Sequence, residues 1–105
     1  MKILLSPDLG YTPEYIIQTL SKTGSEIIEP YFFACQDTFT KLTIPGTFKV
    51  VSKLAFKNCP MLESLVLEEG IEDISQTIVN QCPNLKEITL PESLLVGSVY
   101  LFFRN

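Results

Sequence analysis

Histidine and tryptophan are absent from this chain of 105 residues, and cysteine occurs only three times. Without histidine, a serine or cysteine nucleophile would need a lysine or carboxylate base, and no motif marks such a pair. Three cysteines do not complete a disulfide framework, and no C-x-x-C pair is present to chelate zinc. We therefore expect no enzyme, no metal site and no cofactor.

Long apolar runs and clusters of basic residues are missing as well. No stretch reaches the roughly 18 consecutive apolar residues of a membrane span, and residues 1–5 are too short for the hydrophobic region of a signal peptide. The 12 acidic side chains outnumber the 8 basic ones, which gives a net charge of -4. We predict a cytoplasmic protein that binds neither membranes nor nucleic acid directly, and whose acidity suits a protein partner with a basic surface.

A sequence pattern recurs with a period of 23 residues in the centre of the chain, in residues 51–67 and 74–90. A more degenerate copy begins 23 positions earlier, at Ile28, and keeps Phe33 and Phe39 in register. A fixed period of roughly 20 to 29 residues that contains L-x-x-L-x-L is typical of a leucine-rich solenoid, in which each unit buries its apolar face only by stacking on its neighbours. The sequence thus predicts an α/β solenoid with three repeats in residues 28–96.

Each repeat contains one short predicted strand, at residues 42–44, 65–67 and 88–90. Side chains alternate across a strand, so the strands should form a parallel ladder with an inward and an outward row. The predicted inward residues are Leu42, Ile44, Leu65, Leu67, Ile88 and Leu90. The outward row consists of Thr43, Val66 and Thr89.

The first 27 residues break the repeat pattern. Residues 1–5 read as a strand, after which Thr12 and Pro13 are typical of a helix N-cap and first helical position. Gly24 is placed to end that helix. We expect residues 1–27 to cap the open end of the solenoid, which would otherwise expose apolar side chains and unpaired strand groups.

Residues 97–105 resemble the beginning of a fourth repeat and stop inside it. This half-repeat either caps the C-terminal end or, if its aromatic side chains stay exposed, forms a homodimer contact. The aromatic residues concerned are Tyr100, Phe102 and Phe103. With both caps, the whole of residues 1–105 is predicted to form a single domain.

The cysteines follow the repeat only in part. Cys59 and Cys82 occupy the same position in successive repeats, so they should stack as small buried hydrophobic side chains. A bridge between them is geometrically conceivable, but a reducing intracellular setting disfavours it. Cys35 lies one position before that register, and Phe32 takes the place of an alanine, so we expect the first repeat to be distorted there.

The phrase A-F-x-x-C-x-x-L-x-x-L-x-L runs from Ala55 to Leu67. Through it, residues 51–96 resemble the BspA-like leucine-rich repeats, and residues 28–50 resemble a degenerate copy. The resemblance implies a right-handed solenoid with a parallel sheet on one face, used for protein binding.

Two groups of exposed residues are candidates for partner binding. The first is the outward ladder face, and the second is an acidic edge after the second strand, whose carboxylates could meet Arg or Lys side chains. The alternative is a merely solvated surface, because Thr and Val are good strand residues in any case. The ladder-face candidates are Lys41, Thr43, Ser64, Val66, Glu87 and Thr89, and the acidic-edge candidates are Glu68, Glu69, Glu72 and Asp73.

These features predict a non-catalytic protein–protein interaction module. The alternative is a small acidic inhibitor encoded by a phage or mobile element, similar in kind to an anti-CRISPR protein, that occupies the basic channel of a host nucleic-acid-processing enzyme. Affinity of such an inhibitor should fall steeply with salt, whereas docking through the ladder face should depend on salt only mildly.

Overall fold

The computed structural model describes residues 10–75 and 77–92. The predicted strand at residues 1–5 and the half-repeat at residues 97–105, with Tyr100, Phe102 and Phe103, lie outside the described residues. The elements that position the candidate surface all lie inside them.

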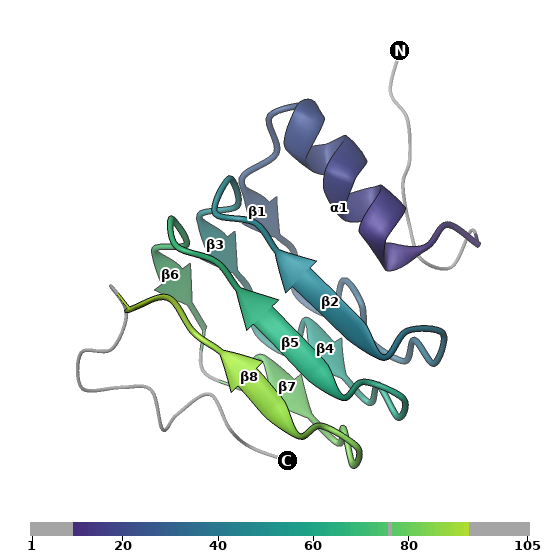
Figure 1. Cartoon of the computed structure of the whole chain (residues 1–105). Helices are drawn as coiled ribbons and strands as arrows, with labels where there is room; N and C mark the ends of the chain where they lie inside the picture. Colours follow the sequence, from purple (N-terminus) through teal and green to yellow (C-terminus); the bar gives the residue numbers. More distant parts are fainter. Residues whose placement is uncertain (1–9, 76, 93–105) are drawn as a thin grey trace.

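One helix and eight short strands form within these ranges (Figure 1), and the strands build three parallel sheets. The ladder sheet has the order β2-β5-β8, the back sheet β1-β3-β6 and the side sheet β4-β7. The bounds are α1 Pro13–Lys22, β1 Ile27–Ile28, β2 Lys41–Ile44, β3 Val50–Val51, β4 Phe56–Lys57, β5 Ser64–Leu67, β6 Asp73–Ile74, β7 Val79–Asn80 and β8 Glu87–Thr89.

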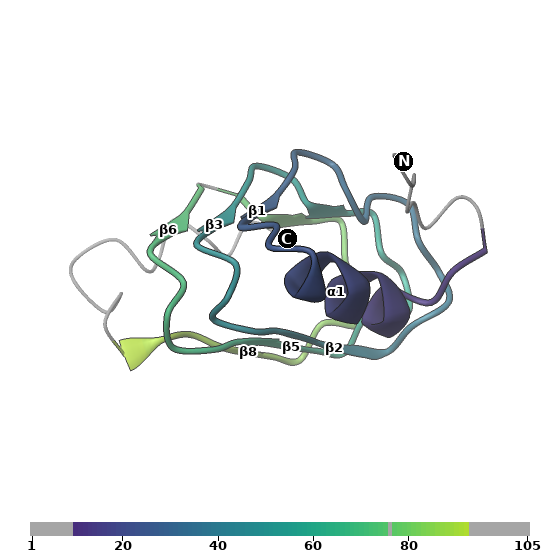
Figure 2. The same cartoon turned by 90° about the horizontal axis from the view of Figure 1, so that it is seen from above.

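Three successive stretches of the chain, which we call rungs, are residues 27–49, 50–72 and 73–92. In the second and third rungs the chain passes through the back, side and ladder sheets in turn, and the first rung contributes a strand to the back sheet and one to the ladder sheet. Paired residues in neighbouring rungs are 23 positions apart, as for Ile28 with Val51 and Val51 with Ile74. Figure 2 shows the ladder sheet and the back sheet as two facing layers. The sequence period is therefore the distance along the chain from one rung to the next.

The ladder sheet has the predicted register. Thr43 pairs with Val66, and Val66 pairs with Thr89, so the predicted outward row is aligned across the sheet. The strands β2 and β5 begin one residue earlier than predicted, and β8 spans Glu87–Thr89, so Leu90 follows that strand instead of closing it.

The core is built from inward-pointing apolar side chains. Residues at equivalent positions of neighbouring rungs pack on one another and so form columns. The rings of Phe33 and Phe56 are nearly parallel, with their centroids 5.5 Å apart and 11° between their planes. Complete burial of each such ring contributes about 2 to 3 kcal/mol. In the third rung Ile88 and Leu90 are only half-buried, although both were predicted to point inward.

Helix α1 begins where the sequence predicts. The Thr12 hydroxyl oxygen accepts a hydrogen bond from the Tyr15 amide at 3.2 Å, and Pro13 occupies the first turn, where an amide hydrogen is not needed. Gly24 ends the helix with φ +88°. Ile16 and Ile17 are buried, and in Figure 2 the helix lies over the space between the two layers at the first rung.

Each rung turns at the same two places through residues with positive φ. The first place is held by Tyr31, Leu54 and Thr77 (φ 60°, 54° and 58°), and the second by Cys35, Asn58 and Gln81 (φ 62°, 57° and 57°). For residues other than glycine this conformation costs about 1 to 2 kcal/mol. Hydrogen bonds to the next rung offset that cost, since the Leu54 amide donates to the Thr77 carbonyl at 2.9 Å.

The distortion expected in the first rung is not found in its backbone hydrogen bonds. The Phe33 amide donates to the Ala55 carbonyl at 2.9 Å, and in the next rung the Phe56 amide donates to the Ile78 carbonyl at the same distance. Cys35 is equivalent to Asn58, and Gln36 stands where later rungs have cysteine. The displaced cysteine therefore changes the side chain at one turn and leaves the course of the backbone intact.

Candidate functional site

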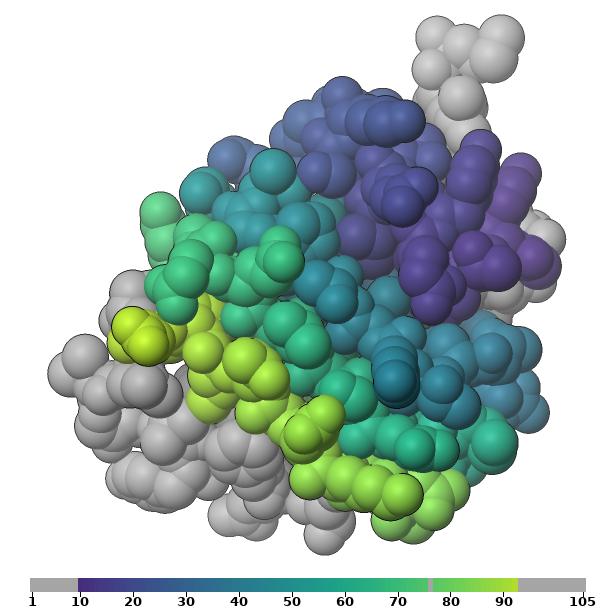
Figure 3. Space-filling model, viewed as in Figure 1, coloured from purple at the N-terminus to yellow at the C-terminus, as the bar shows by residue number. Residues whose placement is uncertain are grey.

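The six ladder-face residues lie on the outer surface of the ladder sheet. Lys41, Thr43, Glu87 and Thr89 are exposed, whereas Ser64 and Val66, in the central strand, are half-buried. Figure 3 views this face from outside, where the strands appear as adjacent diagonal bands running from blue to yellow-green. The face is thus continuous across all three rungs.

The two outward rows of this face differ in chemistry. At the beginning of the strands the row is polar, and the Ser64 hydroxyl donates to the Glu87 carboxylate at 3.3 Å. The neighbouring Lys86 and Glu63 form an exposed ion pair at 3.9 Å, which contributes well under about 1 kcal/mol. Near the end of the strands the row is Thr43, Val66 and Thr89, a β-branched strip that offers methyl groups to a partner.

The acidic edge forms the passage from the ladder sheet to the back sheet in the second rung. All four of its carboxylates, Glu68, Glu69, Glu72 and Asp73, are exposed. The Glu72 and Asp73 amides both donate to the Lys49 carbonyl of the first rung, at 2.9 and 3.0 Å. The Glu69 carboxylate accepts from the Glu92 amide of the third rung. The edge is therefore held to the rungs on both sides.

Lys49, whose carbonyl accepts from this edge, has an ammonium group that is already engaged. Its Nζ donates to the Gly46 carbonyl at 3.2 Å and to the Gly70 carbonyl at 3.3 Å. It thereby links the turns of the first and second rungs. Because this ammonium is directed at carbonyl oxygens, Lys49 forms no ion pair with the carboxylates of the edge.

A hollow of about 500 Å³ joins the ladder face to the acidic edge. Val66, Thr89, Glu68 and Glu69, four of the ten predicted residues, line it together with Leu67 and Leu90. The other six are not brought into this hollow. Lys41, Thr43, Ser64 and Glu87 lie elsewhere on the ladder face, and Glu72 and Asp73 lie beyond the turn at β6.

Sequence reasoning missed the contribution of Leu90 to this hollow. Its position, two residues after Ile88, predicts an inward side chain, yet Leu90 follows the end of β8 and is half-exposed. The equivalent residue of the second rung, Leu67, is buried because the third rung covers it.

The cysteine column is structural. Cys59 and Cys82 are completely buried, as predicted, and none of the three cysteines forms a disulfide. The Cys59 thiol donates to the Phe33 carbonyl at 3.2 Å, and the Cys82 thiol donates to the Phe56 carbonyl at 2.9 Å. Hydrogen bonding with Cys82 and burial raise the pKa of the Cys59 thiol, so this side chain stays protonated and is a poor nucleophile.

No cluster of three or more His, Cys, Asp or Glu side chains in residues 10–75 and 77–92 is arranged to hold a metal ion. Among the same described residues, no helix is long and apolar enough to cross a membrane.

Comparison with known proteins identifies the repeat. The family model of the BspA-type leucine-rich repeat region, with six copies, matches residues 18–105, which is most of the chain. No curated protein and no solved structure matches this chain. The matched range includes all three described rungs. Together with the 23-residue register of the parallel sheets, this match shows that the chain belongs to the BspA-type leucine-rich repeat family.

Proposed function

We propose that this protein is a non-catalytic module that binds one protein partner through the ladder face and the acidic edge. The observation that carries the proposal is the hollow lined by Val66 and Thr89 on one side and by Glu68 and Glu69 on the other. An apolar side chain of the partner would enter this hollow beside Leu90. Lys or Arg side chains around it would meet the two carboxylates. A central apolar anchor within a charged rim is the usual arrangement of a specific protein interface.

The dimensions of the protein support this use. A standard interface buries roughly 800 Å² on each partner. The accessible surface of the chain is 6270 Å², so such an interface would occupy about one eighth of it. The ladder face and the adjoining edge offer a continuous surface of this order, and both are built on backbone that strand pairing holds in place.

The surrounding architecture belongs to the same proposal. We infer a right-handed leucine-rich repeat solenoid whose first rung is capped by α1, because Ile16 and Ile17 are buried against it. At the other end, Ile88 and Leu90 are only partly buried. The half-repeat at residues 97–105 would shield these apolar side chains from water. The caps keep the apolar ends from associating and leave the ladder face free for the partner.

A paired set of double mutants tests the binding surface. Val66→Arg with Glu69→Lys places two new positive charges in the hollow. Ile27→Arg with Glu29→Lys makes the same kind of change on the back sheet of the first rung, in β1 and just after it, two strands away from the acidic edge at β6. Each protein is used to capture partners from the native host, after circular dichroism has shown that it is folded, and captured proteins are quantified by mass spectrometry.

We expect one partner to be captured by the wild type and by the back-sheet mutant, and lost with the hollow mutant. Its affinity, then measured with purified components, should fall by at least about a hundredfold in the hollow mutant, the equivalent of one lost anchor of about 3 kcal/mol. Equal retention by both mutants would show that the hollow is the wrong surface.

A further inference from the structure

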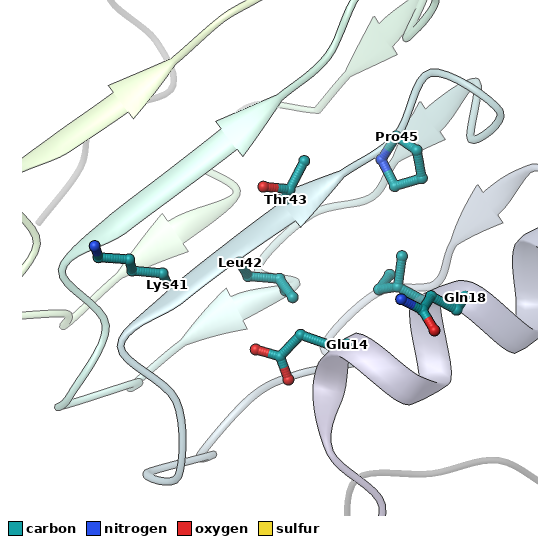
Figure 4. A pocket seen from close by; sticks show the side chains of 7 residues that line it. Glu14, Gln18, Lys41, Leu42, Thr43 and Pro45 are labelled. Carbon is teal, nitrogen blue, oxygen red and sulfur yellow. The ribbon is translucent and has the colours of Figure 1, made fainter.

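A second hollow, of about 410 Å³, lies between α1 and β2 at the opposite end of the ladder sheet from β8. Figure 4 shows the side chain of Leu42 lying between the strand and the helix, with Glu14 and Gln18 on the helix side and Thr43 on the strand side. The floor is apolar, because Ile17 and Leu42 are buried. The complete lining is Glu14, Ile17, Gln18, Lys41, Leu42, Thr43 and Pro45.

Beside this hollow, β2 is an edge strand of the ladder sheet. The carbonyls of Thr40 and Ile44 accept hydrogen bonds from the second rung, at 3.1 Å from the Ser64 amide and 3.0 Å from the Glu68 amide. Even-numbered residues of β2 therefore direct their backbone groups toward β5. Since these groups alternate along a strand, Lys41 and Thr43 direct their amides and carbonyls to the other side, along the hollow.

These outward groups have no partner among the described residues. No hydrogen bond involves the backbone amide or carbonyl of Lys41 or Thr43 in that part of the chain, and α1 contributes none to them. An unpaired parallel edge is a template for another strand, and several peptide-binding domains use an edge of this kind.

We propose that this edge binds an extended segment of a partner protein, which adds a fourth strand to the ladder sheet beside β2. The bond-forming groups are the amides and carbonyls of Lys41 and Thr43. At about 3.3 Å per residue, the segment would pair with the four residues of β2 over roughly 13 Å. This site is distinct from the hollow beside Glu69, because it uses the backbone of the first rung instead of side chains of the second and third rungs.

Charge decides which segment fits. Glu14 and Lys41 are exposed on opposite sides of the hollow, and neither takes part in an ion pair within the described ranges. Successive side chains of an added strand would face the outer surface and the helix alternately. The segment therefore carries an acidic residue beside Lys41, a basic neighbour directed at Glu14, and an apolar residue over Ile17.

Proline substitution separates backbone pairing from side-chain contacts. Thr43→Pro removes the outward amide hydrogen and leaves the bonds to β5 intact, since proline is accommodated on an edge strand. Thr43→Val keeps that amide and removes only the hydroxyl. The probe is a displayed pool of random heptapeptides, selected on the full-length wild-type chain, and the enriched peptides are then synthesised and titrated against all three proteins.

We expect enrichment of alternating β-branched residues with an acidic and a basic residue side by side. Affinity should fall by at least about tenfold in Thr43→Pro, the effect of one lost hydrogen bond, and stay within about twofold in Thr43→Val. Failure to enrich any peptide, or equal binding to both variants, would overturn the proposal.

A second measurement covers the case in which Thr43→Pro does not fold. The Glu14→Lys protein should bind the selected peptide more weakly than the wild type does. It should bind more tightly a peptide in which the basic residue is replaced by glutamate. Amide hydrogen exchange on the free protein provides the last arm. If the Lys41 and Thr43 amides are already protected from exchange without peptide, the edge is occupied and the proposal fails. Protection that disappears on dilution would identify a second copy as the occupant, and protection that persists would identify another part of the same chain.

Discussion

Replacement of Gly46 by alanine should push the first two rungs apart at the turn where Gly46 meets Glu69. A Cβ atom on Gly46 would lie 1.8 Å from the Glu69 carbonyl oxygen and 2.8 Å from the Glu69 carbonyl carbon, both of which are backbone atoms. To reach an ordinary separation of roughly 3.5 Å, the two turns would have to move apart by about 1.7 Å. No flexible side chain is present to relieve this overlap.

The cost follows from what that movement breaks. The hydrogen bonds of Lys49 Nζ to the Gly46 and Gly70 carbonyls, at 3.2 and 3.3 Å, bridge these two turns. Overpacking costs about 1 to 3 kcal/mol, and each lost hydrogen bond adds about 1 kcal/mol. We expect the free energy of unfolding to fall by about 3 kcal/mol, out of roughly 5 to 15 kcal/mol for a domain of this kind.

Thermal unfolding followed by circular dichroism measures this effect, and Tm should fall by about 15 °C. Gly24→Ala is the matched control. Gly24 has φ +88° and no neighbouring atom within 4 Å of an added Cβ, so it should lose only about 1 kcal/mol, from backbone strain. If Gly46→Ala is less destabilising than Gly24→Ala, the close approach of the two turns described above is wrong.

Three other predictions concern the thiols, the turns and the partner. Below pH 9.0, the ordinary pKa of the thiol, the stability contributed by protonated Cys59 is fully present; above it the unfolded chain ionises first, and stability falls by about 1.4 kcal/mol per pH unit. Because the Cys59 and Cys82 thiols titrate as a pair, both are replaced together. Urea titrations between pH 8 and 10.5 should show a shallower alkaline loss for the Cys59→Ala, Cys82→Ala double variant than for Cys35→Ala, and equal slopes would contradict the raised pKa. At Gln81, where φ is 57°, glycine should raise the free energy of unfolding by about 1 kcal/mol and valine should lower it; chemical denaturation measures both, and the same sign for both would refute strain at this turn. Between 50 and 200 mM salt, affinity for the captured partner should change less than about threefold, whereas a loss of more than about a hundredfold together with competition by nucleic acid would favour the inhibitor interpretation.

The ladder register was predictable because the repeat has a constant length. Residues that are 23 positions apart share an apolar pattern, and such units bury it only by stacking in register, which places Thr43, Val66 and Thr89 side by side. The helix was predictable for a different reason. Thr12, Pro13 and Gly24 are strong local signals that do not depend on tertiary contacts.

The back and side sheets could not be predicted in the same way. Their strands are two residues long, too short for an alternating pattern to be visible. The turns with positive φ were hidden too, since Leu54 and Thr77 are not residues that favour this conformation. Stacking of neighbouring rungs imposes it on them.

The 23-residue register correctly placed Cys35 one position before the equivalent of Cys59, which is Gln36. The distortion predicted from that displacement was wrong for the backbone, because the inter-rung hydrogen bonds of Phe33 and Phe56 are alike.

The candidate site was predicted in its parts and not in its assembly. The outward direction of Val66 follows from strand alternation, and the exposure of Glu69 follows from the turn after that strand. Their meeting in one hollow depends on Leu90 and Thr89 of the third rung, and hence on how the last described rung ends. A pattern that treats all repeats as equal does not contain that information.

Strand pairing joins each rung only to the next one, and every paired position is 23 residues from its partner. Within residues 10–75 and 77–92, no strand pair links the first rung directly to the third, so under a force applied to the ends of this part the middle rung has only its two neighbours to hold it. Such a chain should lengthen in equal steps, each releasing one rung from an end. In a cell, a partner that spans all three strands of the ladder sheet would act as a clamp against this stretching.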